Sequence, residues 1–512
     1  MGRKSFVAST LILVLTGMII KALGFFYRVY LSNLIGAEGM GLFQLISPIY
    51  STVILTLTAG ISIAVSRLTA NEIGRQNYIN LRRITSIGLS VITIASVLVS
   101  ALMYINRNFI TQVVLKDSRT YLSLTLLIPL IPIIAGSSAI KGYFYGIQDV
   151  MPSAAAQIIE QLVKMGFVMF IAQKFVQKDI VIACAVAIGG MAAGEIASFI
   201  FIFIRYKFYR YRTIGGRRNS AVSILMSMLS IAVPISANRF ITSVMSAVEV
   251  ILIPRRLVAA GLSYRTAMEE YGKLMGMAIP LIYMPSIITS ALSVTLVPAI
   301  SESLSSGSTG AMRHRTCKAI KLTAVAGCIC TLVFMSFSYE ISQFVYRGQN
   351  IGHILYLLSF TCIFIYLQQT LIGIMNGLGK QTILFWNTVI GLLIRIAFVY
   401  FMVPRYGMAG YVWGMIVSLS TACVVNLWCV ASCAGISINI TEWLIKPVVI
   451  TCLLLPIGRH FYYLINIFNI HGDLKVIVAV TIEVGVMALL MIIAKVINID
   501  EMLEMVYIKR RK

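Results

Sequence analysis

Long, uninterrupted apolar runs recur along the whole chain and constrain its fold more than any other feature. Each run is long enough to cross about 30 Å of hydrocarbon at a helical rise of about 1.5 Å per residue. The runs lack the alternation of apolar and polar residues that barrel strands show, so we predict membrane-spanning α-helices. A chain that is 59% hydrophobic and 12% charged also could not cover its own surface in water.

The fold class that follows is an all-α polytopic membrane protein of about 14 transmembrane helices. The first run follows Arg3 and Lys4, as a signal peptide would. It continues to Leu31 without a cleavage site of small residues, so we interpret it as a retained span. The predicted spans cover residues 6–31, 41–66, 84–105, 120–140, 153–173, 181–204, 222–250, 274–300, 316–338, 353–373, 383–402, 409–432, 446–465 and 476–497.

Basic residues are spread unevenly over the loops of this chain, whose formal net charge is +24. Alternate loops on the side of the N-terminus hold the larger share, which puts both termini in the cytoplasm under the positive-inside rule. The densest basic run, residues 205–218, could suggest nucleic-acid binding. Topology and attraction to anionic membrane lipids explain this run without a further function, so we expect no nucleic-acid partner.

Two pairs of segments repeat at nearly one long interval. Residues 60–72 align with residues 290–302 at an offset of 230. The motif Gly142-x-x-x-Gly146, followed by Lys164, aligns at an offset of 231 with the motif Gly373-x-x-x-Gly377, followed by Arg395. An arginine, Arg83 or Arg313, also follows each member of the first pair at the same interval. Two matches on corresponding elements indicate an internal duplication.

The duplication relates spans that are six apart, so the two copies have the same orientation in the membrane. Parallel repeats of this kind are related by an axis along the membrane normal, with a site between the halves. We therefore predict an N-terminal lobe over residues 1–206 with spans 1–6 and a C-terminal lobe over 207–433 with spans 7–12. Residues 434–512 add spans 13–14 and a basic cytoplasmic tail.

Charged residues inside the predicted spans indicate where function lies, because a charge at the bilayer centre costs about 2.5–3.5 kcal/mol. Such residues usually face a cavity or a partner. Lys21 and Arg239 lie mid-span without an acid one turn away, and they occupy equivalent positions when Thr16 is laid on Pro234. The complete set is Lys21, Arg28, Glu160, Lys164, Glu195, Arg239, Glu249, Arg395, Glu483 and Lys495.

Simpler interpretations exist for several of these charges. Glu160 and Lys164 are four residues apart on one helix face and can neutralise each other. Arg28 and Lys495 lie within snorkelling reach of an interface. Glu195 is either a proton-titrating group or a carboxyl kept neutral by burial.

Two cations that face each other across a lobe interface would bind an anion, and arginine suits phosphate oxygens. A proton- or sodium-coupled drug antiporter would instead need Glu160 or Glu195 in its cavity, and a third alternative is a scaffold that organises envelope synthesis without transport. The chain has no Walker-type loop and only four scattered histidines. We therefore predict that it is not an enzyme and needs no cofactor or metal ion.

The segments Lys21-Ala-Leu-Gly-Phe-Phe-Tyr-Arg28 and Leu34-Ile-Gly-Ala-Glu-Gly-Met-Gly-Leu-Phe43, with the duplicated lobes, resemble the oligosaccharidyl-lipid/polysaccharide exporters of the multidrug/oligosaccharidyl-lipid/polysaccharide superfamily. The resemblance covers essentially the whole chain, is greatest to the sporulation branch of that group, and extends to the lipid II flippases. It implies a V-shaped, MATE-like helical bundle in the bacterial cell membrane. It further implies alternating-access transfer of an undecaprenyl-pyrophosphate-linked glycan, as peptidoglycan precursor for the spore cortex, from the inner to the outer leaflet.

The resemblance also assigns roles to residues. Lys21 takes the place of the family's first cavity arginine, Arg28 lies one residue out of register with the second, and Lys273 matches an arginine at the start of span 8. The flippases have a further arginine in span 2 where this chain has only Ser51, Thr52 and Val53, and an acid beside the second arginine where this chain has Tyr27 and Val29. These departures leave the headgroup open within the class of anionic polyprenyl-linked glycans.

Two groups of candidate site residues result. Lys21, Arg28, Arg239, Lys273, Lys164 and Arg395 are the candidates for binding the anionic headgroup, and Glu160, Glu195 and Glu249 are the candidates for coupling or charge pairing. The expected partners are the polyprenyl-pyrophosphate-linked glycan and anionic membrane lipids. A monomer is compatible with this role, and so are contacts with cell-wall synthesis proteins.

Overall fold

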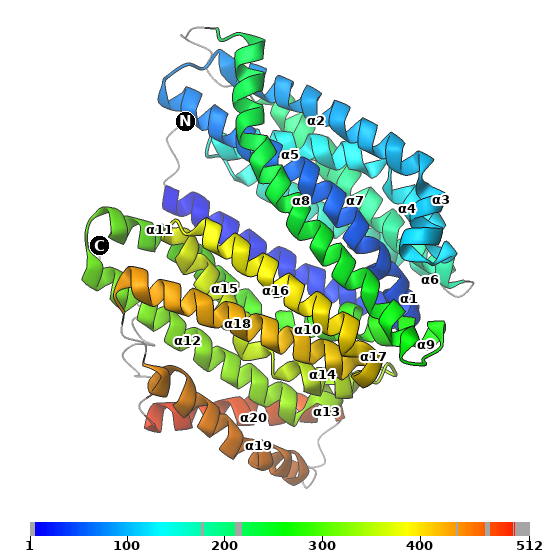
Figure 1. Ribbon diagram of the computed structural model, residues 1–512, viewed down its shortest axis with the longest axis vertical. Coiled ribbons are helices and arrows are strands. Elements are labelled where there is room, and N and C mark those ends of the chain that lie inside the picture. Colours follow the sequence, from blue (N-terminus) through cyan, green and yellow to red (C-terminus); the bar gives the residue numbers. More distant parts are fainter. Residues whose placement is uncertain are drawn as a thin grey trace. The chain divides into compact units, whose positions relative to one another are not determined.

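The computed structural model describes residues 6–175, 179–209, 218–436, 439–465, 472–494 and 496. Helices form all the regular structure of these ranges (Figure 1), which confirms the predicted all-α class. Of the sequence predictions, the charge Lys495, most of the basic run 205–218 and the basic tail lie outside the described residues.

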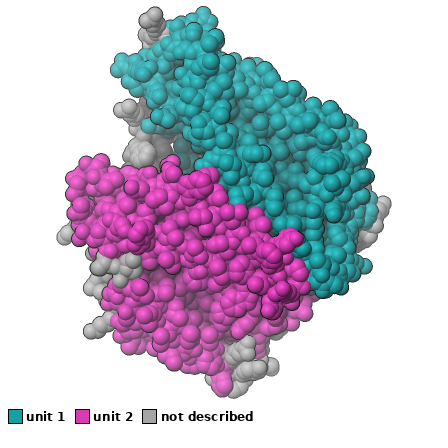
Figure 2. Space-filling model, in the orientation of Figure 1, with its two compact units in different colours: residues 1–272 teal, residues 273–512 magenta. Residues whose placement is uncertain are grey.

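The described chain separates into two compact units, Met1–Gly272 and Lys273–Lys512, which Figure 2 shows in different colours. The first unit contains α1 (Phe6–Gly74), α2 (Asn80–Ile105), α3 (Arg107–Phe109), α4 (Tyr121–Leu127), α5 (Leu130–Gly146), α6 (Met151–Phe175), α7 (Ile180–Phe208), α8 (Ala221–Ala259) and α9 (Tyr264–Gly272). Two short turns of other helix types, η1 (Ile110–Leu115) and η2 (Ser118–Thr120), connect α3 to α4.

The second unit begins with the π-helical turn η3 (Lys273–Ala278). It continues with α10 (Ile279–Tyr283), α11 (Ser286–Ser305), α12 (Thr309–Ser336), α13 (Ser338–Val345), α14 (Gly352–Ser359), α15 (Cys362–Gly377), α16 (Gln381–Phe401), α17 (Val403–Tyr406), α18 (Met408–Ala434), η4 (Thr441–Ile445), α19 (Lys446–Ile465) and α20 (Gly472–Ile493).

Eleven helices among the described residues are long and apolar enough to cross a membrane. Two bent pairs, with angles of 42° between α4 and α5 and 52° between α14 and α15, raise this number to as many as 13 if each pair is one span. Pro129 lies at the first of these bends, where a proline cannot continue the backbone hydrogen-bond ladder.

Helix α1 is itself interrupted at Gly36, whose φ of 71° and ψ of −178° leave the helical region. Its two parts correspond to the first two predicted spans, 6–31 and 41–66. A backbone conformation of this kind is open to glycine and strained for other residues, which explains why a glycine stands at the break. The span count of fourteen stays a prediction.

The internal repeat is visible as repeated helix packing inside each unit. A methyl group added at Gly142 of α5 would lie 2.5 Å from the carbonyl oxygen of Ser62 in α1. One added at Gly373 of α15 would lie 2.6 Å from the carbonyl oxygen of Ser293 in α11. Both pairs are related by an offset of 231, so close crossings of corresponding helices are built from corresponding residues.

Turn geometry follows the same offset. Gln76 and Gly307, and likewise Gln148 and Gly379, are pairs of left-handed residues separated by 231 positions. The packing register of α1 and α11 is therefore 231, one residue more than the sequence alignment of residues 60–72 with 290–302 gave. That alignment rests on a run of small and apolar side chains, in which a shift of one residue changes little.

The predicted seventh span, α8, belongs to the first compact unit and packs along α1. The hydroxyl of Thr52 donates a hydrogen bond to the carbonyl oxygen of Ser243 at 3.2 Å, and Gly60 packs against the backbone of Ala232. The compact units thus divide at Gly272, whereas the predicted lobes follow the sequence repeat. The lobe boundaries at 206/207 and 433/434 stay predictions about the repeat.

The two C-terminal helices α19 and α20 pack against α12 within the second unit. Buried residues of all three helices, among them Leu332, Leu454 and Met487, form one apolar cluster. The side chain of Glu483 in α20 is 1% exposed and accepts a hydrogen bond from the Ser336 hydroxyl at 2.6 Å. The packing of α19 and α20 against α12 is compatible with the prediction that spans 13 and 14 are added to a core of twelve spans.

Candidate functional site

Five charged side chains of the first unit lie close enough to interact electrostatically, and four of them are sequence-predicted site residues. Lys164 interacts with Glu160, Glu195 and Arg28, and Glu195 also interacts with Lys141. We call this group, made of Arg28, Lys141, Glu160, Lys164 and Glu195, the first-unit charge cluster. All five side chains are half-buried, so each keeps some access to its surroundings.

Four helices supply the cluster: α1 carries Arg28, α5 carries Lys141, α6 carries Glu160 and Lys164, and α7 carries Glu195. Small residues bring α6 and α7 together. A methyl group added at Gly194 of α7 would lie only 2.6 Å from the carbonyl oxygen of Glu160. Because Gly194 adjoins Glu195, this close crossing puts the two carboxylates on neighbouring helices at the same level.

The Lys164 ammonium lies over the ring of Tyr27 in α1, with its nitrogen 5.0 Å from the ring centroid. A cation in this position is attracted by the negative face of the ring. Within the part of the chain that the structure describes, Lys164, Glu160 and Glu195 form no ion pair within 4.0 Å. The i,i+4 relation of Glu160 to Lys164 therefore gives an electrostatic interaction without a direct salt bridge.

Three neutral side chains beside the cluster have buried polar atoms without a hydrogen-bond partner among the described residues: Tyr27 Oη, Tyr50 Oη and Gln161 Oε1. Tyr27 is 7% and Gln161 8% exposed. Tyr50 interacts electrostatically with both Glu195 and Glu160. Buried polar groups normally have partners, so their grouping here points to a place where a ligand or water binds.

Tyr50 also lines a small cavity of about 20 Å³ between α1, α4 and α7, together with Ser47 and Met191. A cavity of this size has room for roughly one water molecule. Sequence reasoning missed Tyr50 and Gln161 because a neutral residue in an apolar run carries no charge signal. The sequence distinguishes Tyr27 only as a departure from the flippase pattern.

The remaining predicted residues of the first unit lie outside the charge cluster. Lys21 on α1 and Arg239 on α8 are exposed, while Glu249 on α8 is only 2% exposed and interacts electrostatically with Tyr271. Arg239 directly precedes Phe240, which lines an apolar pocket of about 370 Å³.

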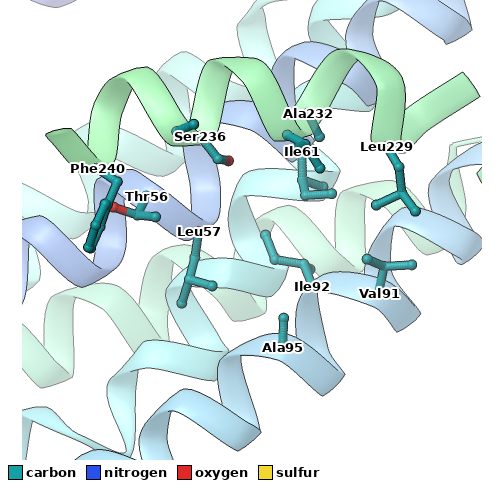
Figure 3. Close-up of a pocket in the computed structure, with 12 residues that line it drawn as sticks. Thr56, Leu57, Ile61, Val91, Ile92, Ala95, Leu229, Ala232, Ser236 and Phe240 are labelled. Carbon is teal, nitrogen blue, oxygen red and sulfur yellow. The ribbon is translucent and has the colours of Figure 1, made fainter.

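Figure 3 shows this pocket, in which Leu229, Ser236 and Phe240 of α8 face Val91, Ile92 and Ala95 of α2. Thr56, Leu57 and Ile61 of α1 complete the lining that the figure labels, with Ala232 of α8. The pocket is suited to a hydrocarbon chain, as any apolar recess within a bilayer would be.

In the second unit, Lys273 begins η3 and Arg395 lies on α16, and both are half-buried. Arg395 occupies the repeat position of Lys164. The residue at the repeat position of Glu160 is Gly391, and α18, which takes the place of α7, contains no acidic residue. The second repeat therefore keeps the cation and lacks both carboxylates.

A separate ion-pair network, absent from the sequence predictions, joins α9 to the break in α1. Arg119 contacts Glu38 at 2.7 Å and Asp117 at 2.9 Å, and Arg265 contacts Glu38 at 3.3 Å. The Tyr264 hydroxyl donates a hydrogen bond to Asp117 at 2.9 Å. Burial raises the pKa of Tyr264, and the charge of Asp117 adds to the effect, so this hydroxyl keeps its proton.

The family model described as "Polysaccharide biosynthesis protein" matches residues 6–304. The chain is 28% identical over 461 residues to stage V sporulation protein B of Bacillus subtilis, covering 88% of this chain and 89% of that protein. It is 22% identical over 419 residues to the lipid II flippase MurJ of the same organism, covering 76% and 75%.

Solved structures show the same fold at low sequence identity. The lipid II flippase MurJ in an inward closed conformation matches with a TM-score of 0.70 and 14% identity, covering 94% of this chain and 99% of that one. An inward-facing multidrug resistance transporter of the MATE family matches with a TM-score of 0.65 and 14% identity, covering 82% and 96%. Eleven long apolar helices among the described residues, together with these relatives, make the chain a multi-pass membrane protein.

Proposed function

The chain belongs to the polysaccharide biosynthesis protein family, as its sequence resemblance to the exporters predicted, and from this premise we propose that it is a flippase for a lipid-linked glycan. The proposed substrate is an undecaprenyl-pyrophosphate-linked glycan, such as the peptidoglycan precursor of the spore cortex. It would pass from the inner to the outer leaflet of the cell membrane by alternating access, in a chain whose termini are both cytoplasmic. The relationship to stage V sporulation protein B and to the lipid II flippase MurJ supports this substrate class.

The observation that carries the proposal is a membrane-embedded cation, Lys164, held over an aromatic ring and without a salt bridge among the described residues. Two further cations, Arg28 and Lys141, belong to the same cluster. Three cations against two carboxylates favour an anionic ligand, and phosphate oxygens are good acceptors for lysine and arginine donors. The exposed Lys21 and Arg239, with Lys273 and Arg395, are proposed as further headgroup contacts along the path.

The competing function is cation-coupled export of cationic drugs, which Glu160 and Glu195 would favour. Membrane vesicles that contain the full-length chain separate the two. The flippase proposal expects translocation of a labelled polyprenyl-pyrophosphate-linked glycan and none of a cationic dye such as ethidium. Transport of the dye without the lipid would overturn it.

Charge-neutral substitutions test the site itself. Lys164→Gln and Arg28→Gln should each reduce lipid translocation by about tenfold or more, since loss of one charge-assisted hydrogen bond costs about 1.5–3 kcal/mol. Arg205→Gln is the matched control, because Arg205 is an exposed arginine near the end of α7. Equal activity of all three variants would exclude the first-unit charge cluster as the headgroup site.

A further inference from the structure

The two repeats differ in one chemical respect, which is the presence of carboxylates among the membrane helices of the site. The first repeat has Glu160 on α6 and Glu195 on α7, and these two acids interact with each other. The second repeat has Gly391 in place of Glu160 and no acid in α18, yet it keeps a cation at Arg395. An anion-binding site does not need carboxylates, so the paired acids of the first repeat call for a separate explanation.

The acids oppose the binding that the cations favour. A pyrophosphate diester carries a negative charge on each phosphate, and it would enter a cluster of three cations and two carboxylates. With both acids ionised, the net positive charge of the cluster is smaller than the charge of the headgroup. Protonation of one acid removes this mismatch and the repulsion between the two carboxylates.

Charged and titratable groups from three further helix positions surround the acid pair. Lys141 on α5 and Lys164 on α6 are the cations that act on Glu195, and Tyr50 on α1 interacts with both acids. Arg28 and Tyr27 on α1 lie one contact further out, because both interact with Lys164. No cation forms a salt bridge with either acid within the described ranges. The pair is therefore only partly neutralised by its surroundings and can respond to an arriving charge.

Two observations independent of the acids indicate that a ligand or water enters here. Tyr27 is more than nine-tenths buried, yet its hydroxyl has no partner among the described residues although Lys164 lies over its ring. Tyr50, also with an unpartnered hydroxyl, lines the cavity of about 20 Å³ and interacts with both acids.

We infer that the Glu160–Glu195 pair takes up one proton when the anionic headgroup binds to the first-unit charge cluster and releases it when the headgroup leaves. The inference rests on the proposed function and adds a coupling ion to it. The proton comes from water and binds to a carboxylate oxygen, and no covalent bond of the lipid changes. Because linkage is reciprocal, headgroup binding strengthens proton binding by the same factor as protonation strengthens headgroup binding.

The test uses the purified full-length chain in nanodiscs with a polyprenyl-pyrophosphate-linked sugar as the probe, because its pyrophosphate diester has no group that titrates between pH 5 and pH 8. Binding is titrated from pH 5 to pH 8 in weakly buffered solution, and proton uptake is recorded with a pH indicator. The probe alone in empty nanodiscs supplies the correction for its own titration. The wild-type chain should take up about one proton per bound lipid, and its affinity should rise by up to about tenfold for each unit of falling pH.

The variant Glu195→Gln should bind the lipid with little dependence on pH and without proton uptake, and Glu160→Gln serves as a second variant should the first not fold. Glu483→Gln is the matched control, because this buried glutamate on α20 bonds Ser336 and is not part of the cluster. It should keep the wild-type uptake.

The possible failures are distinguishable. Wild-type binding without proton uptake overturns the coupling and leaves the proposed function standing. Loss of uptake in Glu483→Gln as well as in Glu195→Gln overturns the assignment to this pair. Absence of lipid binding at every pH overturns the proposed function together with the inference.

Discussion

Alanine substitutions at the two repeated glycine crossings test the packing on which the duplicated fold rests. In Gly142→Ala, the new methyl group would meet the carbonyl oxygen of Ser62 at 2.5 Å, and in Gly373→Ala it would meet that of Ser293 at 2.6 Å. Ordinary van der Waals contact begins at 3.4 Å. Each variant therefore has to separate its two helices by about 0.8–0.9 Å, since backbone cannot move aside as a flexible side chain can.

The expected cost follows from two opposing effects. Overpacking of a well-packed interface costs typically about 1–3 kcal/mol, and alanine in place of glycine gains about 1 kcal/mol of helix propensity. The net effect at each crossing is thus a loss of about 0–2 kcal/mol. Gly166→Ala on α6 is the control, because a methyl group there meets nothing within 4 Å and leaves only the propensity gain.

The assay is reversible unfolding of the purified chain in mixed micelles as the fraction of denaturing detergent rises. The two test variants should each unfold about 1–3 kcal/mol more easily than Gly166→Ala, and by similar amounts. Two test variants as stable as the control would refute the close crossings. Sensitivity at Gly142 with none at Gly373 would refute their equivalence in the repeat.

Three further predictions concern the break in α1 and the ion-pair network beside it. Arg119→Ala removes the partner of Asp117 and Glu38 and should cost about 1.5–3 kcal/mol of unfolding free energy in the same assay, and no loss would contradict the contacts at 2.9 and 2.7 Å. Tyr264→Phe removes only the hydroxyl that donates to Asp117 and should cost about 1–3 kcal/mol, with an unchanged midpoint arguing against the bond. Gly36→Ala should destabilise the chain by about 1–3 kcal/mol because its φ of 71° is strained for alanine, and a stabilised variant would show that α1 is continuous there.

Sequence reasoning could establish the helical membrane fold, since runs such as residues 222–250 are apolar over a bilayer's thickness. It also found Arg28, Glu160, Lys164 and Glu195, because a charge in an apolar run stands out. It could not find that these four share one cluster. Helix contacts are set by the fit of small residues such as Gly194 against a particular neighbour, which the hydrophobic pattern does not encode.

Other features lay beyond the sequence for different physical reasons. Tyr50 and Gln161 are neutral, so they give no signal until their buried polar atoms are seen without partners. The place of α8 in the first compact unit depends on its contacts with α1, whereas the sequence repeat makes it the first helix of a second lobe. The sequence alignment of Gly142 with Gly373 has the same offset, 231, as the helix packing. A close helix crossing accepts only a glycine at this position, whereas the apolar positions of residues 60–72 accept several side chains, so their alignment is one residue out.

Movement of a lipid-linked glycan between leaflets can be measured as transfer in a reconstituted membrane. Proteoliposomes would contain the full-length chain and a fluorescent polyprenyl-pyrophosphate-linked glycan placed in the inner leaflet only. A membrane-impermeant quencher outside would then report arrival in the outer leaflet. We predict a protein-dependent loss of fluorescence that Lys164→Gln slows, whereas loss no faster than in protein-free liposomes would contradict the account.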